Sequence, residues 1–229
     1  MNTNLRLAAR MSDIAAFEAV ELFTRARELE AQGRSIIHME VGEPDFATPQ
    51  TIIDTGMAAL QHGNIHYTPA LGIPALREAI SSWYTSRYHV NVPPERIVVT
   101  AGGSGALLLA LGVLLSPGDE VLMGDPSYPC NRHFVRTLEG QARLIPTGPE
   151  NAYQLTAAMV EQQWLPKTIA VMVASPSNPT GTMIADAEMR AIADVVHARG
   201  GRLGECPVRG VKARGLVDCQ DQRAGARSQ

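Results

Sequence analysis

The sequence predicts an α/β protein with a mostly parallel sheet and helices on both faces. From about residue 96 onward, short apolar segments rich in β-branched residues alternate with segments of helical spacing. Such alternation is typical of parallel strands joined by right-handed helical crossovers. The strand-like segments also end in turns rich in glycine or proline. Turns at the carboxyl edge of a parallel sheet are where ligands bind in this fold class.

The segment 168–174 is the clearest strand because it is short, β-branched and ended by proline. The residues after it, SPSNPTG at 175–181, contain two prolines that prevent both a continuing ladder and a helix start. The chain must therefore turn sharply there. Strands are predicted at 97–100, 120–123, 142–145 and 168–174, and helices at 106–115, 128–138, 155–164 and 186–199.

The chain before residue 96 is predicted to be mainly helical. Helices are expected at 14–32, which Gly33 ends, at 49–62, which Thr48 caps, and at 74–88, and a short extended piece is expected at 35–41. We therefore expect an N-terminal arm over residues 1–50 and the sheet domain over residues 51–203.

Residues 204–229 do not follow this pattern. They carry a net charge of +2, whereas residues 1–203 carry −5, and they contain few large apolar residues. Gly201-Arg202-Leu203 begins like a strand, but no strand is predicted after it. We expect residues 204–229 to be a disordered tail outside the sheet domain, of the kind that a frameshift in the gene produces.

Composition limits the classes of function. With 45% hydrophobic residues, a chain of 229 residues can bury the core of one or two domains. A net charge of −3 gives no electrostatic reason to expect nucleic acid or an anionic membrane as partner. There is no apolar run of about 18 residues and no signal peptide, so a cytoplasmic protein is expected. The three cysteines and six histidines lack ligand spacing, so no disulfide framework and no metal site are predicted.

The glycine-rich turn Gly102-Gly103-Ser104-Gly105 lies between a predicted strand and a predicted helix. Glycines let a ligand approach the backbone, and the N–H groups at a helix N-terminus favour an anion. The Ser104 hydroxyl adds a further donor. The turn therefore predicts a phosphate cradle, with a tight turn that binds nothing as the alternative.

Two more candidate residues follow predicted strands at the same edge. Tyr128 lies between two prolines, where its ring can stack on a flat ligand. Asn178 lies at the tip of the turn after residue 174, with a side-chain amide that can both donate and accept. Together with the glycine-rich turn, these residues predict a site for a phosphorylated planar heterocycle.

Five motifs in this order resemble the N-terminal half of class I/II pyridoxal-phosphate-dependent aminotransferases, over roughly residues 10–203. The motifs are GEPDF at 42–46, HYTPALGIPALR at 66–77, AGGSG at 101–105, DPSYP at 125–129 and NPTG at 178–181. The resemblance implies the pyridoxal-phosphate-dependent transferase fold, the cofactor pyridoxal 5'-phosphate, and amino-group transfer from an amino acid to a 2-oxo acid.

The resemblance also implies roles for single residues. Gly103 and Ser104 would bind the cofactor phosphate, Tyr128 would stack on its ring, and Asn178 would hydrogen-bond the ring hydroxyl. Tyr67 would reach the phosphate in a neighbouring subunit, which implies a homodimer. Gly42 would line the substrate carboxylate pocket. For these last two residues a purely structural role is the alternative: a packed ring for Tyr67 and a turn glycine for Gly42.

The family's chemistry needs a lysine that holds the cofactor as a Schiff base and then moves a proton. The chain has two lysines. Lys167 precedes the strand 168–174, at the opposite edge from the predicted site, and Lys212 lies in the expected tail. No catalytic residue is therefore predicted, and this chain is expected to be inactive and poorly soluble.

Three alternatives stay open. Lyases and synthases that use the same cofactor share these motifs and differ in residues on the substrate side. A nucleotide-binding α/β module could use the same glycine-rich turn, with Asp125 holding a ribose. A non-enzymatic remnant that folds only with a partner is the third.

Overall fold

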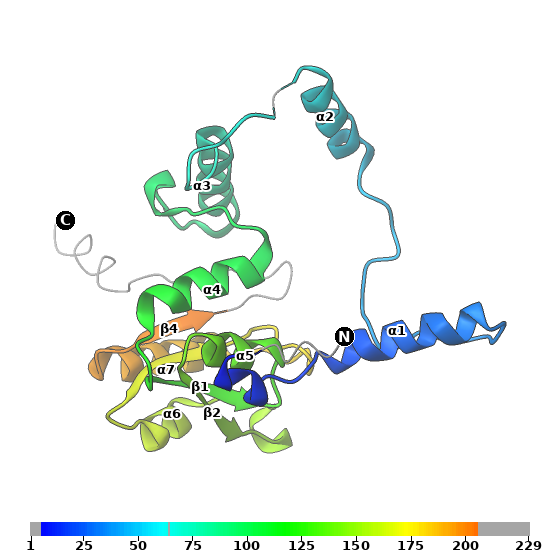
Figure 1. Cartoon of the computed structure of the whole chain (residues 1–229). Helices are drawn as coiled ribbons and strands as arrows, with labels where there is room; N and C mark the ends of the chain where they lie inside the picture. The colour runs from blue at the N-terminus through cyan, green and yellow to red at the C-terminus, as the bar shows by residue number, and fades with distance from the viewer. Residues whose placement is uncertain (1–5, 64, 206–229) are drawn as a thin grey trace, which may run out of the picture. The chain divides into compact units, whose positions relative to one another are not determined.

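The computed structural model describes residues 6–63 and 65–205 of the chain. They divide into two compact units, the sheet unit (residues 6–15 and 101–205) and the helical unit (residues 16–63 and 65–100). Figure 1 shows their elements in chain order. The boundary expected near residue 50 falls inside the helical unit, and the assignment of an arm, a sheet domain and a tail stays a prediction. No helix among the described residues has the length and apolar character needed to cross a bilayer.

Within the described residues, the sheet unit contains four parallel strands in the order β2-β1-β3-β4. The strands are β1 (Glu120–Asp125), β2 (Gln141–Pro146), β3 (Thr168–Val173) and β4 (Arg202–Glu205). The helices that connect or flank them are α4 (Gly102–Leu114), α5 (Cys130–Thr137), α6 (Ala157–Gln163) and α7 (Asp186–Ala198), and the 3-10 turns are η1 (Ala9–Asp13) and η3 (Pro149–Asn151). The predicted parallel α/β fold is confirmed.

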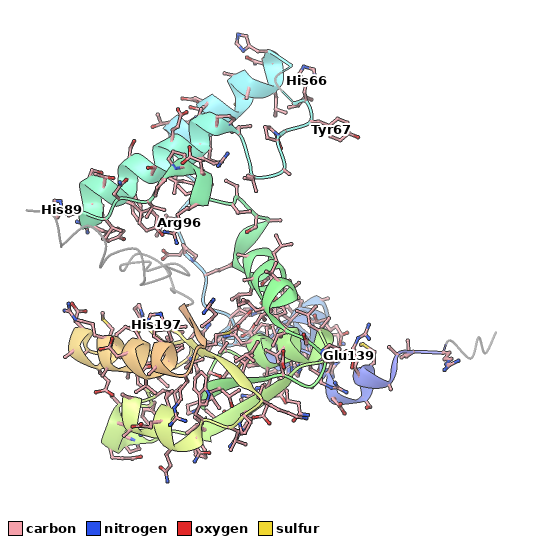
Figure 2. All side chains as sticks on the ribbon, turned by 90° about the vertical axis from the view of Figure 1, so that its left-hand side faces the viewer. His66, Tyr67, His89, Arg96, Glu139 and His197 are labelled. Atoms are coloured by element: carbon pink, nitrogen blue, oxygen red, sulfur yellow. The ribbon has the colours of Figure 1, made fainter. Side chains whose placement is uncertain are left out.

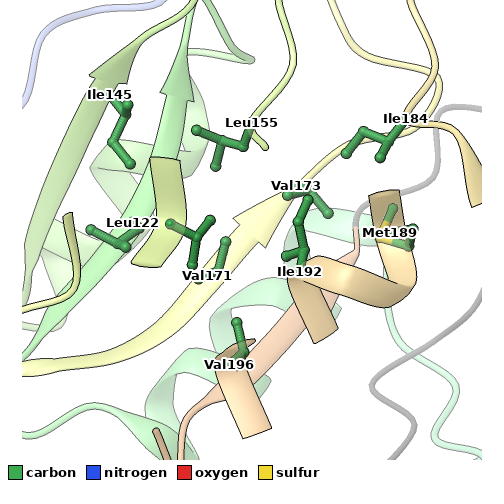
Figure 3. Close-up of a cluster of buried hydrophobic side chains, with 10 residues drawn as sticks. Leu122, Ile145, Leu155, Val171, Val173, Ile184, Met189, Ile192 and Val196 are labelled. Carbon is green, nitrogen blue, oxygen red and sulfur yellow. The ribbon is translucent and has the colours of Figure 1, made fainter. Parts of the chain in front are cut away.

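Alternating side chains along each strand build two cores, one on each face of the sheet. On β1, the side chain of Leu122 joins the core under α6 and α7, whereas Val121 and Met123 join the core under α4 and α5. Figure 3 shows the first of these cores. Its buried members are Leu122, Ile145, Leu155, Val160, Val171, Val173, Ile184, Met189, Ile192 and Val196. Helices therefore cover both faces of the sheet, as predicted.

The helical unit contains α1 (Glu18–Ala31), α2 (Gln50–Gln61), α3 (Pro74–Tyr88) and the 3-10 turn η2 (Pro94–Arg96). The bounds of α3 are those predicted, because Pro74 at the first helical position fixes φ for the helix. The Arg77 side chain donates through Nε to the carbonyls of Pro94 at 2.9 Å and Ile97 at 3.0 Å. These bonds tie the segment after η2 to α3.

Several element predictions were wrong. The segment 97–100 is not a strand, because it forms no ladder with another described segment. Ile97 has an extended backbone (φ −103°, ψ 123°), and the Val99 N–H donates to the Leu71 carbonyl at 3.0 Å, without further pairing. Local residue preference makes such a segment extended, but only a partner makes it a strand.

Three element ends also differ from the prediction. The glycine-rich turn is already helical, since α4 begins at Gly102 rather than at residue 106. Thr48 does not cap α2, because Pro49 occupies the N-cap position. The prediction that no strand follows Leu203 was wrong as well, since β4 runs to Glu205 in register with Val173. The rest of the predicted tail, residues 206–229, lies outside the described residues.

Candidate functional site

The loops after β1 and β3 lie at one edge of the sheet, because these two strands are parallel neighbours. We call residues 126–129 the Tyr128 loop and residues 174–185 the Asn178 loop. A cavity of about 20 Å³ lies between them. Its polar or loop-derived lining includes Pro126, Ser127, Asn131, Tyr153, Gln154 and Ser177. The structure thus brings the predicted Tyr128 and Asn178 segments together.

Three polar side-chain atoms at this edge are buried without a hydrogen-bond partner among the described residues. They are the Ser127 Oγ, the Asn131 Oδ1 and the Arg132 Nε, and Asn131 is only 5% exposed. Buried polar groups in folded proteins nearly always have a partner. The edge therefore has spare hydrogen-bonding capacity beside the Tyr128 loop, as a site for a polar ligand requires.

Tyr128 is half-buried between β1 and α5, and its carbonyl accepts a bond from the Asn131 N–H at 3.2 Å. That bond fixes the loop to the start of α5. Asp125, the residue that a ribose-binding alternative would use, accepts a bond from the Arg132 guanidinium at 3.1 Å. The Asp125 carboxylate is therefore already ion-paired with Arg132.

The turn that carries Asn178 is closed by backbone hydrogen bonds. The Ser177 N–H donates to the Thr182 carbonyl at 2.8 Å, and the Gly181 N–H donates to the Ser177 carbonyl at 2.8 Å. Gly181 has a φ of 69°, which explains glycine at that position. Asn178 is half-buried near the tip of this turn.

The predicted phosphate cradle is the first turn of α4. Gly102 has a φ of +75°, whereas Gly103 has no positive φ, and an added Cβ on Gly103 would meet nothing within 4 Å. Ala101 offers no side-chain cap to the helix. Local geometry therefore explains glycine at 102 but not at 103, where an open backbone suits the close approach of an anion.

These features fit a phosphorylated planar cofactor in part. Gly103 and Ser104 are exposed at a helix N-terminus, and the Tyr128 and Asn178 loops share one cavity. Neighbours of Tyr128 and Asn178 line that cavity, whereas Gly103, Ser104, Tyr128 and Asn178 themselves do not. The contacts of all four residues with a cofactor therefore stay predictions.

The other two candidates lie in the helical unit. Tyr67 lies between α2 and α3 and is fully exposed, and Figure 2 shows its ring projecting away from the ribbon. Gly42 lies in the exposed segment between α1 and α2, and a Cβ there would meet nothing within 4 Å. Their roles in the site stay predictions.

Lys167 lies where the sequence predicted, directly before β3 at the amino edge of the sheet. It is exposed, and its carbonyl accepts a bond from the Glu120 N–H at 2.8 Å. A strand of six residues separates it from the Asn178 loop, which corresponds to about 20 Å. Its ammonium therefore cannot reach a ligand at the carboxyl edge. Lys212 lies outside the described residues.

Sequence reasoning missed Asn131 and Gln154. Asn131 shares a helical stripe with Val135 and Leu138, so a buried amide on an apolar face was the available signal. Gln154 is 8% exposed and hydrogen-bonds the Asn178 loop. Nothing in its sequence context indicated this contact.

Shifted pKa values occur away from this edge. In the helical unit, hydrogen bonds to Glu40 at 2.6 Å and to Glu30 at 2.9 Å raise the pKa of His38. The same bonds lower the pKa of both glutamates. In the sheet unit, a hydrogen bond from Arg136 lowers the pKa of Asp13 and links η1 to α5.

The fold is a parallel α/β sheet with the Tyr128 and Asn178 loops at its carboxyl edge. The sequence model of the family described as aminotransferase class I and II matches residues 34–203. A valine–pyruvate aminotransferase from Mycobacterium tuberculosis is 36% identical over 198 residues, which are 86% of this chain and 50% of that protein. A (5-formylfuran-3-yl)methyl phosphate transaminase from Methanocaldococcus jannaschii is 38% identical over 78% of this chain and 46% of its own length.

Solved structures agree. The aspartate aminotransferase from Thermus thermophilus with maleate matches with a TM-score of 0.85 and 31% identity, over 89% of this chain and 53% of that chain. This chain therefore belongs to the class I and II aminotransferases, a family that uses pyridoxal 5'-phosphate. It spans about half the length of the curated relatives that it matches.

Proposed function

We propose that this chain carries the part of an aminotransferase site that holds pyridoxal 5'-phosphate by noncovalent contacts. Gly103 and Ser104 bind the phosphate, Tyr128 stacks on the ring, and Asn178 hydrogen-bonds the ring hydroxyl. The observation that supports this most is the match of the aminotransferase family model to residues 34–203, a range that contains all four residues. The loops that carry Tyr128 and Asn178 also meet at one edge of the sheet. When bound, the cofactor supplies the electron sink and carries the amino group.

The reaction of the complete site is amino-group transfer from an amino acid to a 2-oxo acid. Family membership and relatives named for aspartate and for valine and pyruvate support it. In that assembly Gly42 lines the substrate carboxylate pocket and Tyr67 reaches the phosphate of a second subunit in a homodimer. The homodimer and the cytoplasmic location stay predictions.

This polypeptide by itself binds the cofactor weakly, without covalent attachment, and has no transaminase turnover. Covalent attachment needs a lysine amine at the carboxyl edge. Lys167 is at the amino edge, and Lys212 lacks the Ser-x-x-Lys context that the family uses. The noncovalent contacts would then have to hold the cofactor alone.

A titration with pyridoxal phosphate, followed by borohydride reduction and peptide mapping, tests this. We expect saturable but weak difference spectra, no response to NAD, and no pyridoxyl label on a lysine. Lys167→Ala and Lys212→Ala should leave binding unchanged. A stoichiometric label on either lysine, or turnover with any amino acid and 2-oxo acid pair, would contradict the proposal.

A further inference from the structure

The Asn178 loop has no helix or strand of its own among its described residues. Its shape therefore depends on a few hydrogen bonds. The Ser177–Thr182 bond closes the turn, and the Ile184 N–H donates to the Ser175 Oγ at 3.0 Å. Both bonds lie inside the loop, so neither fixes the loop to the rest of the sheet unit.

Gln154 supplies such an external contact. Its Nε2 donates to the Thr182 carbonyl at 2.9 Å, to the Thr182 Oγ1 at 3.2 Å and to the Ala174 carbonyl at 3.3 Å. Its own backbone N–H is held by the Asn151 carbonyl at 3.1 Å, at the end of η3. The side chain is thus fixed from behind and reaches into the loop.

The arrangement joins the two stems of the loop through one nitrogen atom. Ala174 directly follows β3, and Thr182 lies on the returning stem, beyond the Asn178 turn. The Ala174 and Thr182 carbonyls can only accept, so the NH₂ end of the amide faces them, and its two hydrogens are shared among the two carbonyls and the Thr182 hydroxyl. Because Gln154 is 8% exposed, water cannot readily replace these bonds.

We propose that Gln154 is a positioning residue that holds the two stems of the Asn178 loop together and thereby aims the Asn178 amide at the ligand. Its role toward a cofactor rests on the proposed function above, whereas its role in holding the loop does not. Gln154 touches no cofactor in this assignment and acts through Asn178.

Hydrogen exchange of the loop amides tests the structural part in the full chain. Gln154→Met keeps the length of the side chain and removes the donor. Gln154→Glu keeps its shape but directs a carboxylate at three acceptors. We expect the amides of Ser177, Gly181 and Ile184 to exchange roughly 10-fold faster in the Met variant, and faster again in the Glu variant.

Gln154→Lys restores donors, since an ammonium can supply three hydrogens. Its loop amides should exchange close to the wild-type rate. The matched control is Gln163→Met, which removes a partly buried amide that bonds Arg143 at 3.0 Å, away from the loop. Unchanged protection at Leu122 and Ile145 in every variant shows that the core is intact. Two results would overturn the proposal. One is an unchanged exchange rate of the loop amides in the Met and Glu variants, and the other is a rate in the Lys variant as fast as that in the Met variant.

Binding of pyridoxal phosphate tests the functional part. Gln154→Met should weaken the binding of pyridoxal phosphate several-fold. With an analogue that lacks the ring hydroxyl, the wild type and the variant should bind equally, because the analogue offers Asn178 no hydroxyl to bond. Faster loop exchange with unchanged affinity would overturn the role in aiming Asn178. If the wild-type chain shows no binding at any concentration of pyridoxal phosphate, the proposed function fails. The exchange rates of the loop amides still decide whether Gln154 holds the loop.

Discussion

The two units of this chain differ most in what they bury. Every buried hydrophobic residue except Ala26 and Ile97 lies in the sheet unit, where two cores sandwich the sheet. Helices α2 and α3 of the helical unit bury no residue. Large apolar side chains there are exposed, among them Ile37, Met39 and Phe46, at 87%, 88% and 75%.

This difference in burial shows which residues have positions that packing against neighbouring residues determines. Tyr128 and Asn178 stand on loops anchored to a packed sheet, so local contacts fix them. Tyr67 and Gly42 stand on segments without a core of their own among the described residues. Burial, rather than motif strength, therefore separates Tyr128 and Asn178, whose positions local contacts fix, from Tyr67 and Gly42. The roles of all four residues in a site stay predictions.

Self-association is the largest effect that the comparison predicts. Extended exposed apolar surface is typical of interaction or aggregation sites, and the helical unit carries most of it. We expect the isolated chain to form heterogeneous assemblies in gel filtration coupled to light scattering. Elution as one discrete folded species would show that this surface does not drive association.

A matched pair of leucines compares the packing of the two units directly. Leu122 in β1 is fully buried, whereas Leu60 in α2 is 65% exposed. Leu122→Ala should lower the free energy of unfolding by about 2–5 kcal/mol because it opens a cavity. Leu60→Ala should change it by less than about 0.5 kcal/mol. Urea denaturation measures both, and equal losses would remove the basis of the comparison.

A pair of glycines separates folding from binding within the sheet unit. Gly102→Ala should cost about 1–2 kcal/mol, because its φ of +75° strains an L side chain. Gly103→Ala should leave stability unchanged or slightly higher, yet weaken the binding of pyridoxal phosphate. Thermal unfolding and spectral titration measure the two effects. Unchanged binding in the Gly103 variant would remove this residue from the phosphate cradle.

The smallest predicted effect concerns the His38 cluster of the helical unit. Because the pKa of His38 is raised, its contribution to stability is complete below the ordinary histidine pKa of 6.5 and is lost as pH rises through the raised pKa. The lowered pKa values of Glu30 and Glu40 mean that theirs is present above 4.5 and is lost as pH falls. The contacts of His38 with Glu30 and Glu40 therefore stabilise the helical unit most between about pH 4.5 and 6.5.

The Glu40→Gln variant checks that assignment. Glu40 makes the largest contribution to the raised pKa of His38, so its loss should bring the His38 pKa back toward 6.5. A titration of the His38 ring by NMR follows the change. An unaltered titration curve would show that the Glu40 contact does not form in solution.

Sequence reasoning succeeded where local pattern and packing agree. The 168–174 strand and the Pro74 helix were both predictable, because proline and β-branched residues restrict the backbone locally. The segment 97–100 was not, because a strand also needs a partner. The continuation of β4 past Leu203 was missed for the converse reason: backbone pairing with β3 makes a strand without an apolar pattern.

The site shows the same division. Tyr128 and Asn178 follow strands, so their shared edge was predictable from parallel topology alone. Gln154 was not, because its three contacts come from a loop distant in sequence. Asn131 gave a weak signal as an amide on an apolar stripe. Contacts between distant loops depend on tertiary packing, which the sequence pattern does not contain.

The most direct test of the noncovalent site is amide NMR of the labelled chain with added pyridoxal phosphate. We expect the signals of Gly103, Ser104, Tyr128 and Asn178 to shift together along one binding curve. Shifts confined to one of these segments, or centred on the residues around Lys212, would contradict it.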